Sequence, residues 1–166
     1  MSEFSRVYDL RHLPTGPVEL SATPEECTAL ARRFALVAVK ALSATVQLDA
    51  KGTTISAKGH LRAQIVQSCA ISGDDLPARI DEAFDLRFVP APATQAEELE
   101  LEAGDLDEIE YEGMQFDLGE ALAQTMALGI DPYAEGPRAE AVRRAAGLLD
   151  EQASGPFAAL KGLLKD

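Results

Sequence analysis

The feature that most constrains the fold is a pair of alternating runs on either side of a glycine-containing turn. Residues 42–49 alternate between apolar and polar side chains, and the same pattern resumes over residues 55–65 after Lys51-Gly52. Successive side chains of a strand point to opposite faces, so each run can cover a core with one face and meet solvent with the other. The pattern predicts a long antiparallel β-hairpin.

Two further signals flank this hairpin. A third alternating run covers residues 80–88, with Glu82 interrupting its apolar face. Ahead of the hairpin, residues 23–26 (Thr-Pro-Glu-Glu) combine an N-cap threonine, a proline at the first helical position and a glutamate that completes a capping box. Apolar residues at i, i+3, i+4 and i+7 from Cys27 to Phe34 predict a helix with Cys27 on its buried face.

The chain after the third run predicts a second helix. Ile109 and Tyr111 favour a short edge strand, and Asp117 opens a helix that should end near Gly129. The expected class is α+β: an antiparallel sheet, as a meander or in a barrel-like form, packed with one helix from the N-terminal half and a second helix after an acidic loop.

The expected organisation is one main domain with a tail. Residues 1–132 are predicted to form a single α+β domain that includes an acidic loop at residues 91–113. Residues 133–166 are predicted to be a peripheral, helical and partly disordered tail, with a helix over residues 138–149. An apolar stripe that includes Phe157, Leu160 and Leu164 is too short to be a stable helix alone.

Charge is distributed very unevenly along the chain. Residues 1–90 carry 10 basic and 11 acidic side chains, and residues 138–166 carry 5 basic and 4 acidic ones. Residues 91–137 carry 13 acidic and no basic side chains, which accounts for the net charge of −13. Such a segment repels phosphate backbones and attracts basic surfaces, although it can also be a solvated face without any partner.

Other sequence features indicate the compartment. No run of apolar residues is long enough to span a membrane, and the N-terminus lacks a secretory pattern. Two cysteines, Cys27 and Cys69, suggest no disulfide framework. A cytoplasmic location without membrane contact is therefore expected.

Motifs for catalysis or cofactor binding are not found. There is no phosphate-binding loop, dinucleotide fingerprint or nucleophile elbow. His12 and His60 are isolated, and Cys27 and Cys69 belong to different elements, so neither a triad nor a zinc site is indicated. The carboxylates of the acidic loop lack the spacing of a calcium-binding EF-hand. We expect no catalytic residue, cofactor, metal or small-molecule substrate.

Three segments occur in a distinctive order: residues 65–72 with 80–84, the helix start at residues 116–120, and the tail at residues 155–161. Together they resemble the YceD family of bacterial proteins, which is linked to accumulation of large-subunit ribosomal RNA, and the tail is similar to the family's Asn-Pro-Phe ending. Many members carry a Cys-x-x-Cys pair near the hairpin exit. Here Ser72 stands where the second cysteine of that pair would be, three residues after Cys69. The resemblance therefore carries no two-cysteine metal or redox site over to this chain.

The resemblance implies a non-enzymatic ribosome-biogenesis factor that supports synthesis, processing or stability of large-subunit ribosomal RNA through protein or RNA contacts. The expected partner is a basic ribosomal protein or precursor of that RNA. The acidic loop would attract a basic partner, and an apolar anchor in the tail would add affinity. The predicted partner-binding residues are Glu97, Glu98, Glu100, Glu102, Asp105, Asp107, Glu108, Glu110, Phe157, Leu160 and Leu164.

Three alternatives stay open at the level of sequence. The protein could be an acidic binding module or chaperone for a basic ribosomal protein. It could instead bind RNA directly through a basic sheet face formed by Lys40, Lys58, Arg62 and Arg87. An RNA-processing hydrolase with a metal held by the acidic loop is disfavoured, because carboxylates on a loop make a poorly preorganised site.

Overall fold

The computed structural model describes residues 2–92 and 108–147. These residues divide into two compact units. The larger unit lies within Met1–Val66 and Pro77–Ile130, and the smaller lies within Gln67–Leu76 and Asp131–Asp166. The elements in chain order are β1 (Val7–Asp9), the 3₁₀ turn η1 (Leu10–His12), β2 (Val18–Ser21), α1 (Pro24–Arg33), β3 (Ala38–Lys51), β4 (Thr54–Ser68), β5 (Asp75–Pro90), β6 (Glu108–Tyr111), β7 (Gln115–Asp117), α2 (Leu118–Leu128) and α3 (Ala139–Ala145).

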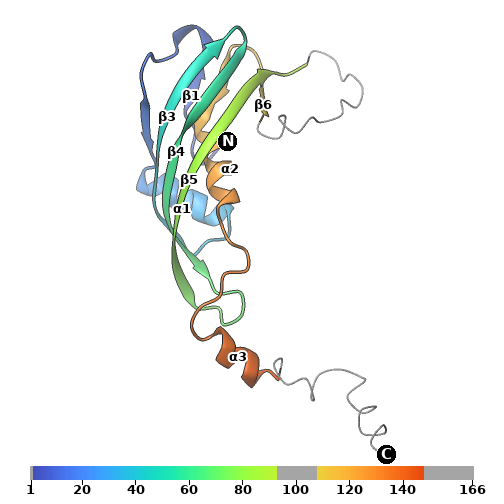
Figure 1. Cartoon of the computed structure of the whole chain (residues 1–166). Helices are drawn as coiled ribbons and strands as arrows, with labels where there is room; N and C mark the ends of the chain where they lie inside the picture. The colour runs from blue at the N-terminus through green and yellow to red at the C-terminus, as the bar shows by residue number, and fades with distance from the viewer. Residues whose placement is uncertain (1, 93–107, 148–166) are drawn as a thin grey trace, which may run out of the picture. The chain divides into compact units, whose positions relative to one another are not determined.

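The predicted hairpin is confirmed as β3 and β4 (Figure 1). The two strands pair antiparallel from Lys51↔Thr54 to Ala38↔Val66, with a bulge between Val39 and Ala41. Gly52 in the turn has a φ of 65°, a conformation that glycine adopts without steric cost.

The strands form a five-stranded sheet in the order β2-β3-β4-β5-β6. From β2 to β5, chain order and spatial order agree, as a meander predicts. The strand β2, for which the sequence shows no clear alternation, pairs antiparallel with β3. The predicted edge strand is confirmed as β6, but it joins β5 in parallel. Within the described ranges the sheet stays open, with β2 and β6 as edge strands, so the barrel-like alternative is not realised.

Both predicted helices of the larger unit are present. Thr23 caps α1, and Glu26 completes the capping box by accepting the backbone N–H of Thr23. Asp117 caps α2 by accepting the N–H of Glu120, and the helix ends at Leu128 with Gly129 as its C-cap, near the predicted end. Both helices are N-terminally capped by side chains, which satisfies N–H groups that a helix leaves unpaired.

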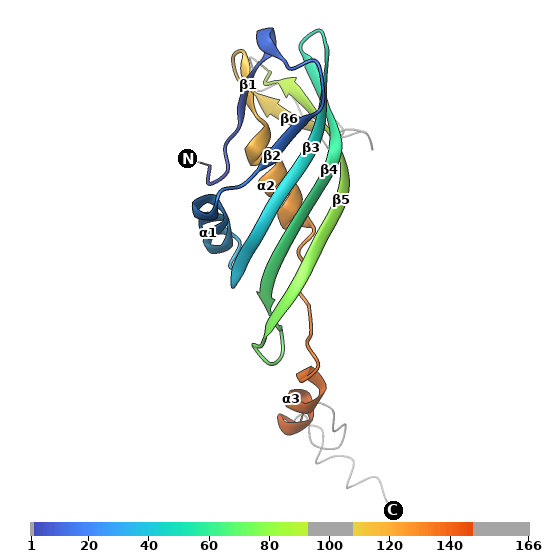
Figure 2. The ribbon, with the colours of Figure 1, turned by 90° about the vertical axis from the view of Figure 1, so that its left-hand side faces the viewer.

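The two helices pack on the inner face of the sheet (Figures 1 and 2). The inner positions of β3 and β4, such as Val46, Ile55 and Leu61, form one core with Leu122 and Met126 of α2, and all five are 0% exposed. Cys27 of α1 belongs to this core, as predicted. Burial of such aliphatic side chains contributes roughly 1.5–3 kcal/mol each.

A second, two-stranded sheet closes one end of this core. β1 pairs antiparallel with β7, with Tyr8 opposite Phe116. The Phe116 ring also packs against Phe88 of β5, with ring centroids 4.6 Å apart. Residues 2–10 mix apolar and polar side chains without a clear boundary, and only Val7–Asp9 of this segment forms a strand.

The smaller unit holds the turn between β4 and β5 together with residues 131–147. The helix predicted over residues 138–149 is present as α3, but it ends earlier than predicted, at Ala145, and Gly147 has a φ of 74°. The division into a domain at residues 1–132 and a tail stays a prediction. No helix in the described ranges has both the length and the apolar character needed to cross a membrane.

Candidate interaction surface

The outer face of the sheet brings together three of the four predicted RNA-facing residues. Lys58 and Arg62 lie on the outer face of β4, and Arg87 lies on the outer face of the neighbouring strand β5. Lys58 and Arg62 are four residues apart, so the two-residue period of a strand places both on the same face of β4. Lys40 is exposed but occupies the bulge at the beginning of β3, so it departs from the regular alternation of that strand.

Each of these three cations faces a carboxylate. Lys58 Nζ lies 3.0 Å from Asp85 Oδ2, and Arg87 Nη1 lies 2.9 Å from Glu108 Oε1. Arg62 Nε lies 3.6 Å from Asp81 Oδ2, and His60 contacts the same carboxylate. The outer face therefore carries a ladder of alternating charges rather than a basic patch. Its attraction for a phosphate backbone is reduced accordingly.

Most of the predicted partner-binding residues lie outside the described residues. Only Glu108 and Glu110 of the acidic set are described, both in β6. Glu108 uses its carboxylate in the ion pair with Arg87, whereas Glu110 is exposed. The residues outside the described ranges are Glu97, Glu98, Glu100, Glu102, Asp105, Asp107, Phe157, Leu160 and Leu164.

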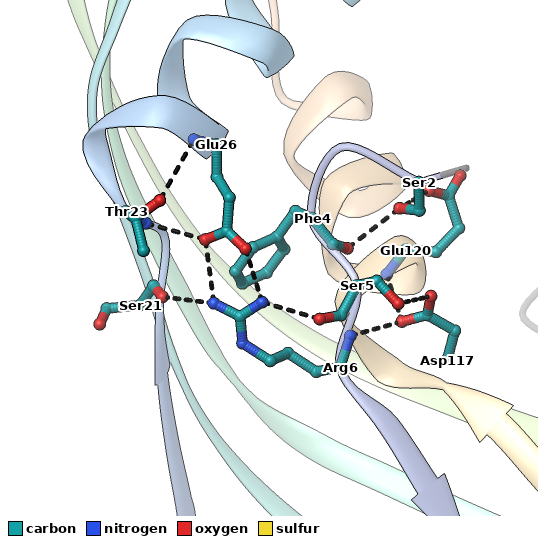
Figure 3. A network of polar contacts seen from close by, with 9 residues as sticks. All are labelled: Ser2, Phe4, Ser5, Arg6, Ser21, Thr23, Glu26, Asp117 and Glu120. Atoms are coloured by element: carbon teal, nitrogen blue, oxygen red, sulfur yellow. Dashed lines mark hydrogen bonds and ion pairs between the residues drawn. The ribbon is translucent and has the colours of Figure 1, made fainter.

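A polar network connects the N-terminal segment to α1 (Figure 3). The Arg6 guanidinium donates to both carboxylate oxygens of Glu26, at 2.7 and 2.9 Å, and to the backbone carbonyls of Ser5 and Ser21. The hydrogen bond from Arg6 lowers the pKa of the Glu26 carboxyl group. Glu26 thus serves both the capping box and a bidentate ion pair, which is the stronger form of arginine–carboxylate contact.

The same network reaches the first turn of α2. Asp117 Oδ1 accepts the backbone N–H groups of Arg6 and Glu120, at 2.8 and 3.1 Å, and Asp117 Oδ2 accepts the hydroxyl of Ser5 at 2.6 Å. Glu120 accepts the hydroxyl of Ser2 at 2.5 Å. These contacts fix residues 2–6 to the first turns of both helices. We therefore interpret the network as a clamp that holds the N-terminal segment. The sequence indicated only its capping residues, because Arg6 is distant from both helices in the chain.

Cys69 is the most chemically distinctive residue of the smaller unit. Its Sγ accepts the backbone N–H groups of Ser72 at 3.3 Å and Gly136 at 3.2 Å, and the side chain is 3% exposed. Hydrogen bonding from Ser72, and then from the Gly136 backbone, lowers the pKa of the thiol to about 6. In the same unit Arg138 donates to Asp74 and lowers its pKa to about 2. No three histidine, cysteine or acidic side chains cluster as metal ligands in the described parts.

Comparison with known proteins gives one family. The model of the family described as "Large ribosomal RNA subunit accumulation protein YceD" matches residues 57–164, from β4 to beyond α3. Comparison with curated proteins and with solved structures gives no match. The matched range covers more than half of the chain and includes all three segments that carry the resemblance, residues 65–72 with 80–84, residues 116–120 and residues 155–161. The chain belongs to the YceD family of large ribosomal RNA subunit accumulation proteins.

Proposed function

We propose that this protein supports the accumulation of large-subunit ribosomal RNA as a non-enzymatic factor that binds a basic ribosomal protein. Family membership supports the role in RNA accumulation. The charge distribution supports the class of partner, because residues 91–137 carry 13 acidic and no basic side chains. A surface of one charge sign steers partners of the opposite sign and repels those of the same sign.

The pairing of charges on the sheet is the observation that favours a protein partner over RNA. A surface that binds RNA electrostatically needs unneutralised lysine and arginine side chains. Here Lys58, Arg62 and Arg87 each face a carboxylate of β5 or β6. These three described cations of the predicted RNA face therefore offer little excess positive charge. The chain as a whole has 28 acidic and only 15 basic residues, so much of its negative charge cannot be paired within the chain in the same way.

Affinity purification from native cells tests this proposal. The tagged full chain is captured at low salt, and the column is then washed at high salt, which screens charge–charge contacts. Large-subunit ribosomal proteins should elute in the high-salt wash. Recovery of neither these proteins nor precursor RNA from cells rich in the tagged protein would contradict the proposal. Cleavage of precursor RNA by the purified protein, lost on Asp105→Ala with Asp107→Ala, would contradict its non-enzymatic part.

Direct RNA binding is a second candidate, supported by the weakness of surface ion pairs. The Lys58–Asp85 pair is more than 60% exposed on both sides, and such pairs contribute at most about 1 kcal/mol. A phosphate can therefore compete for the lysine, and exposed Lys40 adds a cation without a described partner. In a gel-shift assay with large-subunit RNA fragments, Lys58→Glu with Arg62→Glu should abolish binding, whereas Arg32→Glu on α1 should not. Retained binding would remove this candidate.

A further inference from the structure

The β6 side of β5 is open along part of its length. β6 pairs with β5 only from Arg87 to Pro90, whereas β5 begins at Asp75. Within the described ranges no other strand pairs with this side of β5. Such an edge presents unpaired N–H and C=O groups that can template the pairing of another chain.

The parity of β5 identifies the groups that face this open edge. The N–H of Ala91 donates to the carbonyl of Tyr111 at 2.9 Å, so odd-numbered residues direct their main-chain groups toward the β6 side. Ile80, Phe84 and Phe88 are buried at even positions, so the alternation holds throughout. Among the described residues, the main-chain groups that face this side of β5 with no paired strand therefore belong to Arg79, Asp81, Ala83 and Asp85.

Pro77 marks the end of this open edge. It is also odd-numbered, so the N–H that proline lacks would have faced the same side. Proline is tolerated within a sheet where its nitrogen faces solvent. The segment that can accept an added strand is consequently Arg79–Asp85, between Pro77 and the first residue paired with β6.

A groove runs along this edge. It is lined by the consecutive residues Glu82–Leu86 of β5 and by Thr125, Leu128 and Gly129 at the end of α2. Consecutive residues of a strand can line one groove together only where the strand's edge borders it, because its faces alternate. Leu128 is 88% exposed, which leaves an apolar contact open to a partner side chain.

The charge in the groove selects the partner. Glu82 occupies an even position between buried Ile80 and Phe84, yet it is exposed. Among the described residues it has no ion pair, unlike Asp81 and Asp85 on the outer face. An inward-facing charge on an edge strand disfavours pairing with an apolar strand or with a second copy of itself, whose Glu82 would repel it. A lysine or arginine removes this penalty.

We propose that the edge of β5 at Arg79–Asp85 takes up an extended basic segment of the partner protein as an added strand. A lysine or arginine of that segment faces Glu82, and an apolar side chain covers Leu128. The inference rests on the proposed function, and it names this edge of β5 as the site that binds the basic ribosomal protein. In strand addition, main-chain hydrogen bonds provide affinity and side-chain contacts provide specificity.

Hydrogen exchange of the free full chain is the first test. The amides of Arg79, Asp81, Ala83 and Asp85 should exchange fast, because no strand protects them, while those of Ile80 and Phe84 should exchange slowly. Protection of the four odd amides in the free protein would overturn the proposal, because the edge would then be covered by the chain itself or by a second copy. Measurement across protein concentrations separates these two occupants.

A short peptide that alternates lysine and valine is the second test. It should slow exchange at the four odd amides, and Ala83→Pro and Glu82→Lys should each weaken its binding about tenfold or more, which is about 1.4 kcal/mol. Ala83→Pro removes an N–H that faces only the open edge. Glu19→Lys, on the exposed face of edge strand β2, makes the same charge change and should alter affinity less than about twofold. Equal binding by all variants, or preference for a glutamate–valine peptide, would overturn the proposal.

Measurements in cells separate this inference from the function on which it rests. Large-subunit ribosomal RNA is quantified in cells that lack the protein and in cells that carry the wild type or Ala83→Pro. Reduced RNA with both the deletion and Ala83→Pro supports the edge as the working site. Full restoration by Ala83→Pro would overturn the edge while leaving the function intact. Unchanged RNA on deletion would overturn the function itself.

Discussion

Arg33 in the last turn of α1 donates two hydrogen bonds to Glu120 in the first turn of α2. Arg33 Nη2 lies 2.6 Å from Glu120 Oε1, and Arg33 Nη1 lies 2.8 Å from Glu120 Oε2. Both side chains are about three-quarters buried, and this contact is the main cause that lowers the pKa of Glu120 to about 2. The pair joins the last turn of α1 to the first turn of α2 within the larger unit.

Replacement of Arg33 should destabilise the protein in a pH-dependent way. Because the pKa of Glu120 is lower in the folded than in the unfolded protein, the contribution is present above pH 4.5 and is lost as pH falls toward about 2. Arg33→Met should cost about 1–2 kcal/mol at pH 7, after allowance for solvent screening, and much less at pH 3. Urea denaturation at both pH values measures this. Arg32→Met, one residue earlier, is the control, and an equal loss for both variants would contradict the assignment.

Loss of the α1 cap should have a smaller and separable effect. Thr23→Ala removes the hydroxyl that accepts the Glu26 N–H at 3.3 Å, and such caps contribute about 1 kcal/mol. Thr23→Ser keeps the hydroxyl and should retain most of the stability. Urea denaturation distinguishes the two variants, and an equal loss for serine and alanine would show that the hydroxyl is not the stabilising group.

A side chain at Gly59 should be poorly tolerated. A Cβ there would lie 2.0 Å from the backbone oxygen of Thr45 on β3 and 3.0 Å from the ring of Phe84. Both neighbours belong to the packed sheet, so Gly59→Ala should destabilise the protein by about 2–3 kcal/mol. Gly16→Ala is the matched control, because a Cβ at Gly16 meets nothing within 4 Å. Thermal unfolding of both variants measures the difference, and similar midpoints would contradict the close approach at Gly59.

The two cysteines should titrate far apart. Hydrogen bonds lower the pKa of Cys69 to about 6, whereas burial raises the pKa of Cys27. The ultraviolet absorbance of the thiolate should therefore rise with a midpoint near pH 6 in Cys27→Ser, and this step should be missing in Cys69→Ser. Since the lowered pKa favours the thiolate in the folded protein, Cys69 adds stability as pH rises above about 6. A midpoint near 9 in Cys27→Ser would show that the backbone donors do not hold the sulfur.

Local patterns were sufficient for the elements whose causes are local. The alternation on both sides of Gly52 predicts the β3–β4 hairpin, because strand side chains repeat every two residues. The Thr23–Glu26 box and Asp117 predict where α1 and α2 begin, because a cap acts within one helical turn. β2 was missed because its four residues are too few to show a period.

The amino-acid sequence by itself determined the α+β class, the hairpin, the helix boundaries and the segregation of acidic charge. Tertiary structure decided the parallel joining of β6, the clamp between Arg6 and Glu26, and the pairing of Lys58, Arg62 and Arg87 with carboxylates. It also decided that, among the described residues, no strand pairs with the edge of β5 beside Leu128 and Glu82. The physical reason is range: caps and periodicity act within a few residues. Ion pairs and strand edges instead depend on which distant segments the common core brings side by side.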